Sequence, residues 1–143
     1  ANLAVAERWV TEHPDTEFDF FLPPYSILFW DKVIREGRTE AVFAAIRQAG
    51  QTLLQYDNVK FYGYLMDPEI VTNLDNYCDY IHHSGGVCRE ILAMLQREEG
   101  RLTEENLEET LANWREFVVH YDYDQFWDER FWIQWNAEHA AAP

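Results

Sequence analysis

The alternation of apolar and polar positions predicts helices and strands in turn along the first half of the chain. Residues 1–13 carry apolar side chains at helical spacing, and a proline ends the segment. Residues 18–22 form an aromatic run that two prolines stop, which predicts a short, largely buried strand. Residues 40–54 again have one apolar face, and residues 59–65 predict a second strand. This order is typical of a parallel sheet in an α/β fold.

The second half of the chain is predicted to be a loop followed by helices. The loop covers residues 66–84, and a helix follows over residues 86–97. Thr103 is placed to cap a further helix over residues 104–120. Residues 121–135 are rich in aromatic side chains, which predicts either packing over the domain's own core or, if they are exposed, an oligomer contact.

The length and the hydrophobic content set the size of the fold. A chain of 143 residues is enough for one domain, and 48% hydrophobic residues are enough to form a core. Two predicted strands alone make a poor sheet, and a parallel pair needs cover on both faces. We therefore expect further strands, supplied either by a longer parent chain or by a partner.

Charge and cysteine content disfavour several classes of partner and site. The formal net charge of −15 disfavours binding to nucleic acid and to anionic membranes. No apolar run approaches the ~20 residues that span a bilayer, and the first residues lack the basic start of a signal peptide. Cys78 and Cys88 do not have the spacing of a zinc site. We expect two free, partly buried thiols, with one disulfide as the alternative in an exported protein.

Candidate chemistry lies in residues 72–84, which follow a predicted strand and precede a helix. Ligands of open α/β sheets bind at the carboxyl ends of strands. Asp79 stands three residues before His82, so its carboxylate can hold the imidazole in one tautomer. The imidazole can then act as a general base toward a serine hydroxyl. The alternative is an aspartate that caps the following helix beside a surface histidine.

Two runs of residues carry a resemblance to a known family. The first is FFLPPYS at residues 20–26, and the second is TNLDNYCDYIH at residues 72–82. In this order they resemble SGNH/GDSL-type proteins of bacterial cell-envelope acylation systems. The resemblance covers about residues 1–97 and implies the C-terminal part of a three-layer α/β/α SGNH-type fold with few parallel strands. Residues 98–143 would then form a helical, aromatic-rich extension.

The catalytic part of this resemblance is incomplete. Asp79 and His82 would be the acid and the base of a Ser-His-Asp triad. The family's Gly-Asp-Ser-like block and the later Gly and Asn blocks of its oxyanion hole are missing, and the only serines are Ser26 and Ser84. Ser84 is instead placed to cap the helix that follows it. We therefore expect the chain to be catalytically inert by itself.

The resemblance also implies a function and a location. The parent protein would be a serine esterase or O-acyltransferase acting on an acylated cell-surface polysaccharide or another envelope polymer, with a membrane-bound O-acyltransferase as partner. It would work outside the cytoplasmic membrane, in the periplasm or at the cell surface, with the parent protein anchored to the membrane by an N-terminal segment. Contacts to the substrate would come from Tyr25, Ser26, Asn73 and Tyr77, although the turn at residues 23–26 is equally explained by the end of the strand. No cofactor and no metal is expected.

A second hypothesis comes from a different functional class. A two-stranded sheet exposes edges that another copy of the chain can cover. The chain would then be a non-catalytic interaction domain that forms a homo-oligomer through its aromatic tail and its open sheet edge.

Overall fold

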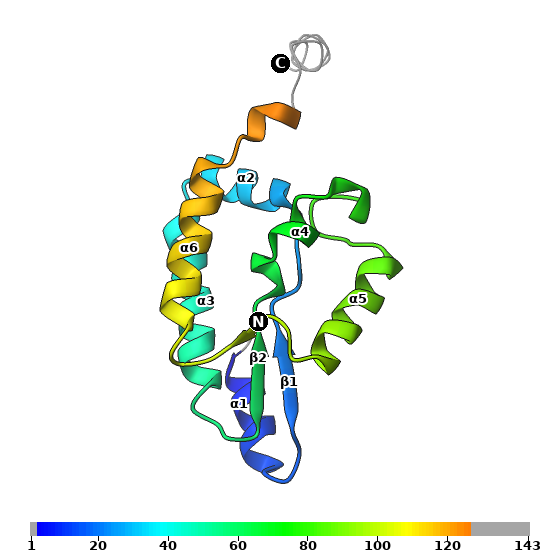
Figure 1. The fold of residues 1–143 in the computed structure, drawn as a ribbon. Helices are drawn as coiled ribbons and strands as arrows, with labels where there is room; N and C mark the ends of the chain where they lie inside the picture. The colour runs from blue at the N-terminus through cyan, green and yellow to red at the C-terminus, as the bar shows by residue number, and fades with distance from the viewer. Residues whose placement is uncertain (1–2, 127–143) are drawn as a thin grey trace, which may run out of the picture.

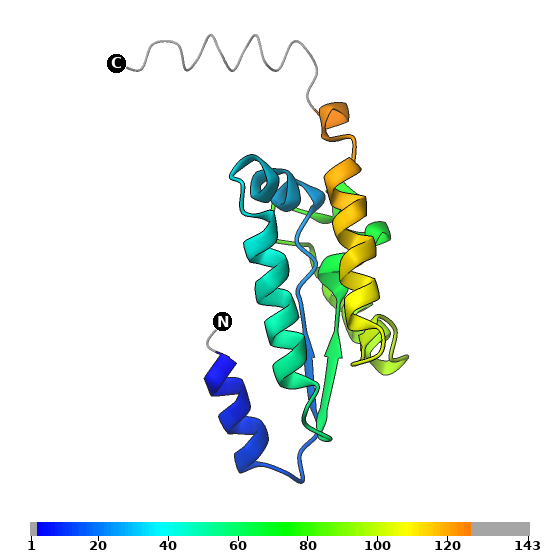
Figure 2. The same cartoon turned by 90° about the vertical axis from the view of Figure 1, so that its left-hand side faces the viewer.

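The computed structural model describes residues 3–126 of the chain. Within these residues, six α-helices surround a three-stranded mixed sheet (Figures 1 and 2). The predicted α/β class is therefore confirmed. In chain order the elements are α1 (Leu3–Glu12), β1 (Phe18–Phe21), α2 (Ile27–Arg35), α3 (Thr39–Leu53), β2 (Val59–Tyr62), η1 (Tyr64–Met66), α4 (Pro68–Val71), η2 (Leu74–Asn76), α5 (Gly85–Gln96), β3 (Arg101–Leu102), α6 (Leu107–His120) and η3 (Tyr123–Phe126).

The sheet has the strand order β1-β2-β3. β1 and β2 are parallel, with Phe18 opposite Val59. β3 pairs antiparallel with the other edge of β2 and places Leu102 opposite Phe61. Sequence patterns did not predict β3, because two residues are too few to show the period of a strand. Further strands were expected from a longer parent chain or from a partner. That expectation is wrong for the strand beside β2, because β3 belongs to this chain.

Helices cover both faces of the sheet. α3 and α6 lie side by side on one face, and α5 lies on the other (Figures 1 and 2). The main core lies under α2, α3 and α6, and its largest fully buried side chain is Trp30. The ring of Trp30 lies 5.1 Å from Phe43 and 6.1 Å from Trp114. A smaller cluster that includes Tyr62, Tyr64 and Ile91 joins the sheet to α5.

β1 is more exposed than the sequence predicts. Asp19 and Phe21 are exposed, whereas Phe18 and Phe20 are half-buried. The aromatic run suits a buried strand, but in the described part of the chain β1 is an edge strand with one neighbour. The prediction of a largely buried strand is therefore wrong.

The helix predictions agree with the structure to within a few residues, with two omissions, α2 and the short α4. Helices were expected over 1–13, 40–54, 86–97 and 104–120, and the structure has α1, α3, α5 and α6 there. α2 was not predicted, although Ile27, Trp30 and Val33 have helical spacing and are buried.

Two further differences arise from local hydrogen bonds. α6 begins later than expected, because Thr103 and Asn106 close a reciprocal pair: the Thr103 amide donates to Asn106 Oδ1 (2.8 Å), and the Asn106 amide donates to Thr103 Oγ1 (3.3 Å). The loop expected over residues 66–84 contains α4 and η2, because Asp67 caps one and Asn73 caps the other.

The C-terminal part of the described chain packs onto the rest. β3 and α6 lie beyond residue 97, where the SGNH-type part was expected to end, and they join the sheet and the main core. Tyr121, Tyr123 and Phe126 of the aromatic tail also contact that core. The remaining tail aromatics lie outside the described residues. None of the described helices is long and apolar enough to cross a membrane.

The fold makes a testable prediction at Asn58, whose side-chain amide donates to the carbonyls of Val10, His13 and Thr16 at 3.0–3.2 Å. These bonds tie α1 to the start of β2. We expect Asn58→Ala to lower the free energy of unfolding by about 1–3 kcal/mol, measured by urea denaturation. The control Asn113→Ala, on the exposed side of α6, should change it by less than about 0.5 kcal/mol. Equal effects of the two substitutions would contradict this role.

Candidate functional site

The two segments that carry the sequence motifs meet at the carboxyl ends of β1 and β2. The Ser26 amide and the Ser26 hydroxyl both donate to the carbonyl of Tyr80, at 3.1 and 3.0 Å. The Tyr77 hydroxyl donates to the carbonyl of Pro24 at 2.9 Å. These bonds hold residues 72–84 against the turn that follows β1. The edge of the sheet predicted from the sequence is therefore where both motifs lie.

Asp79 and His82 form the pair expected from their spacing. His82 Nδ1 lies 2.6 Å from Asp79 Oδ2. Asp79 Oδ1 accepts hydrogen bonds from the amides of Ile81 (2.8 Å) and His82 (2.7 Å). The bond from His82, followed by the two backbone amides, lowers the pKa of Asp79 to about 2. The carboxylate is therefore ionised at neutral pH and orients the imidazole, whose side chain is 73% exposed.

Neither serine of the chain is arranged as a nucleophile for this imidazole. Ser26 is 1% exposed, and its hydroxyl donates to the carbonyl of Tyr80. Ser84 occupies the N-cap position of α5, as expected, but makes no side-chain capping bond there. No hydrogen bond joins His82 to either serine in the described part of the chain. The pair can orient a proton-accepting ring, but among the described residues it is not hydrogen-bonded to a serine that it could activate.

The residues expected to contact a substrate have structural contacts of their own. The Tyr25 ring packs on Phe29, with ring centres 5.0 Å apart. The side chain of Asn73 accepts the amide of Asp75 and caps η2. Burial, more than any charge, raises the pKa of the Tyr77 hydroxyl. The structure thus brings Tyr77 close to the turn at residues 23–26. Asn73 instead stabilises the short helix η2 that follows it.

The cysteines are exposed, contrary to the expectation of partly buried thiols. Both are free thiols, and Cys88 Sγ lies 3.6 Å from His83 Nδ1. Among residues 3–126, no three His, Cys, Asp or Glu side chains are grouped to hold a metal ion.

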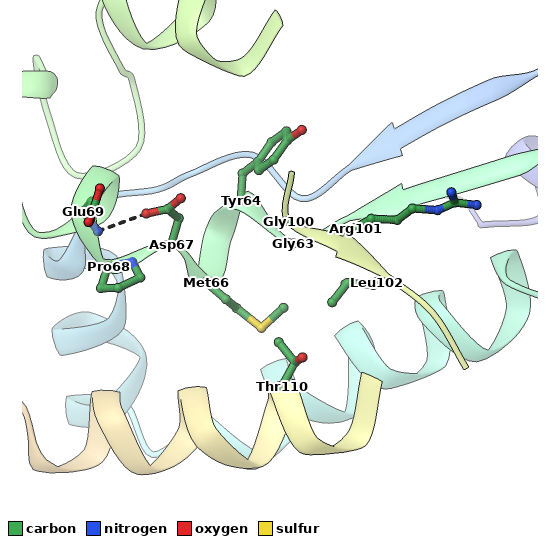
Figure 3. Close-up of a pocket in the computed structure, with 10 residues that line it drawn as sticks. All are labelled: Gly63, Tyr64, Met66, Asp67, Pro68, Glu69, Gly100, Arg101, Leu102 and Thr110. Atoms are coloured by element: carbon green, nitrogen blue, oxygen red, sulfur yellow. Dashed lines mark hydrogen bonds between the residues drawn. The ribbon is translucent and has the colours of Figure 1, made fainter. Parts of the chain in front are cut away.

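A pocket that the sequence did not predict lies at the carboxyl end of β2 (Figure 3). It has a volume of about 330 Å³. Three separate parts of the chain form its walls, namely Gly63–Glu69, Gly100–Leu102 and Thr110 of α6. In Figure 3 the side chains of Met66, Leu102 and Thr110 point toward one another across its apolar end.

Two glycines shape this pocket. A Cβ at Gly63 would lie 2.8 Å from Met66 Cε, so a side chain there would displace Met66. Gly100 has φ +71°, and a Cβ there would lie 3.1 Å from the ring of Tyr64. These glycines are the only sequence signal for the site, and they stand too far apart in the chain to be linked without the fold.

A larger hollow of about 590 Å³ lies beside α3. Its walls come mainly from α3, with Leu3 and Leu22 completing them. The only charged side chain in its lining is Arg38.

Comparisons with known proteins point away from the SGNH/GDSL family. No family model matches the chain, and no solved structure matches it. The chain is similar to UPF0735 ACT domain-containing proteins of Lacticaseibacillus casei (strain BL23) and Lacticaseibacillus paracasei (strain ATCC 334). Each is 24% identical over 90 residues, which cover 63% of this chain and 62% of the relative. The match thus spans about three-fifths of the length of these relatives.

The esterase or O-acyltransferase function expected from the sequence is therefore wrong, as is the resemblance that implied it. The relatives are named as ACT domain-containing proteins, and their names describe neither an esterase nor an acyltransferase. The structure gives the Asp-x-x-His spacing a local cause. Asp79 and His82 do pair, but through a local turn that needs no catalytic partner.

The geometry of this pair predicts its behaviour in acid. The pKa of Asp79 in the folded chain is about 2, below its ordinary value of 3.8. The pair therefore stabilises the fold at pH values above 3.8. That contribution is lost as the pH falls from 3.8 toward 2. In a carbon-13 NMR titration of the side-chain carboxyl, we expect His82→Ala to raise the pKa of Asp79, since His82 is the largest cause of the shift. His83→Ala should leave it unchanged, and an equal response to both substitutions would contradict the pairing.

Proposed function

We propose that this chain is a non-catalytic regulatory domain that binds a small molecule in the pocket at the carboxyl end of β2. Two findings support the proposal. The curated relatives are named ACT domain-containing proteins. The pocket has the concave shape and the mixed lining of a ligand site, and its volume is near the low end of the ~300–1,000 Å³ typical of such sites.

The observation that carries the proposal is the origin of the pocket walls. Gly63–Glu69 leads from β2 into α4, Gly100–Leu102 includes β3, and Thr110 belongs to α6. The Gly63 amide donates to the carbonyl of Gly100 at 3.0 Å, so two of these walls already touch. A ligand between them would add contacts to all three segments at once and would shift the population of their relative positions. That coupling is what a regulatory domain requires.

Substitution of Thr110 tests the location. Thr110→Trp places a large ring in the pocket, and we expect it to weaken the binding of a small ligand at least about tenfold. The ligand is first found by screening a library of small polar compounds with ligand-observed NMR. The control Ala112→Trp adds the same ring on the exposed side of α6 and should leave affinity unchanged. Equal binding by both variants, or a screen without binders, would contradict the proposal.

Self-association is a second candidate function, favoured by the free edge of β1. The Phe18 and Leu22 amides donate toward β2, so the peptide groups of Asp19 and Phe21 point away from it. Phe21 is 40% exposed at this edge. Another strand could bond to these groups and continue the sheet.

Sedimentation of two lysine variants tests this candidate. Phe21→Lys puts a charge on the free edge of β1, and we expect the dimer dissociation constant to rise at least about fivefold. Val119→Lys is the matched control, because Val119 is 43% exposed on α6, away from the sheet edge. A wild-type chain that stays monomeric at high concentration would rule out self-association.

A further inference from the structure

We infer that the ligand of the β2-end pocket is a small organic cation, an amine with a short apolar body. This inference rests on the proposed ligand-binding function and names the chemical class that the site selects. It follows from the distribution of apolar and charged groups around the pocket.

One end of the pocket is apolar. Leu102 and Met66 are almost fully buried, and their side chains approach Thr110 in Figure 3. An apolar group of a few carbon atoms that entered here would lose water-exposed surface without leaving a polar atom unpaired. This end therefore favours an uncharged aliphatic part of a ligand.

The opposite wall is acidic. Asp67 and Glu69 both line the pocket and stand beside each other in Figure 3. Asp67 Oδ1 accepts the amides of Glu69 (3.0 Å) and Ile70 (3.3 Å), which fixes the orientation of the carboxylate. In the described part of the chain, neither Asp67 nor Glu69 takes part in a salt bridge. An ammonium group at this wall would meet two negative charges and several acceptor oxygens.

Arg101, the basic residue of the lining, does not neutralise the charge of Asp67 and Glu69. Arg101 Nη1 lies 2.7 Å from Glu98 Oε2, and in Figure 3 the side chain of Arg101 extends away from Asp67 and Glu69. An anionic ligand would have to compete with Glu98 for this guanidinium. With the chain's net charge of −15, the field around the site also favours a cation over an anion.

Three small molecules of similar shape and different charge test the inference. Isobutylamine, isobutanol and isobutyrate are titrated into the nitrogen-15-labelled chain, and the amide shifts of Gly63, Gly100 and Thr110 are followed. We expect isobutylamine to move these signals with an apparent affinity at least about tenfold above that of the other two. The binding should also persist at moderate salt, unlike a diffuse attraction to an acidic surface.

Two matched variants test whether the wall that contains Glu69 binds the ammonium group. Glu69→Gln should weaken isobutylamine binding about three- to tenfold. Glu109→Gln makes the same change of charge on α6, outside the pocket lining, and should leave it unchanged. Glu69 is preferred to Asp67 for this test because the Asp67 carboxylate also caps α4.

The outcomes separate this inference from the function on which it rests. If isobutanol or isobutyrate moves the same signals as strongly as isobutylamine, the pocket binds ligands but the amine class is wrong. The amine class is also overturned if isobutylamine moves only signals elsewhere, or if Glu69→Gln and Glu109→Gln behave alike. The ligand-binding proposal itself falls only if the wider library also gives no binder at this pocket.

Discussion

The parallel pairing of β1 with β2 is the constraint on which the rest of the structure depends. Its register places Phe21 opposite Tyr62, so the chain leaves both strands at the same edge of the sheet. The amide of Leu65 then donates to the carbonyl of Leu22 at 3.0 Å, which extends the contact beyond the strands. The turn at residues 23–26, the Asp79–His82 loop and the pocket all lie at this edge. A shift of register would separate them.

The Asp79–His82 pair shows how a catalytic spacing can have a local cause. One oxygen of Asp79 satisfies two backbone amides of its own turn, and the other binds the imidazole. Such turns are common wherever an aspartate begins a tight bend. The geometry is that of a triad's acid and base, but in the described part of the chain neither serine is hydrogen-bonded to His82: Ser26 donates to the carbonyl of Tyr80, and Ser84 stands at the N-cap position of α5.

The sequence predicted those parts of the fold whose causes are local. Helical spacing found α1, α3, α5 and α6, and aromatic runs bounded by turn residues found β1 and β2. β3 was missed because only two residues pair with β2. The burial of β1 was predicted wrongly because composition does not show whether a strand lies at an edge.

The candidate site was less predictable than the fold. The closeness of Tyr77 to the turn at residues 23–26 was expected, because both follow strands at one edge. The pocket was not, because it joins Gly63, Gly100 and Thr110, which only the tertiary structure brings together. The sequence does not show that Gly100 has a positive φ. It also does not show that the missing side chain of Gly63 leaves space for Met66.

The proposed function requires that a small molecule bind at the carboxyl end of β2. The most direct test is a crystal structure of the chain soaked with a set of small amines, alcohols and carboxylic acids. We expect bound density between Met66 and Thr110, with an amine nitrogen toward Asp67 and Glu69. Density found only at other surfaces, such as the Asp79–His82 loop, with this pocket empty, would contradict ligand binding at the end of β2.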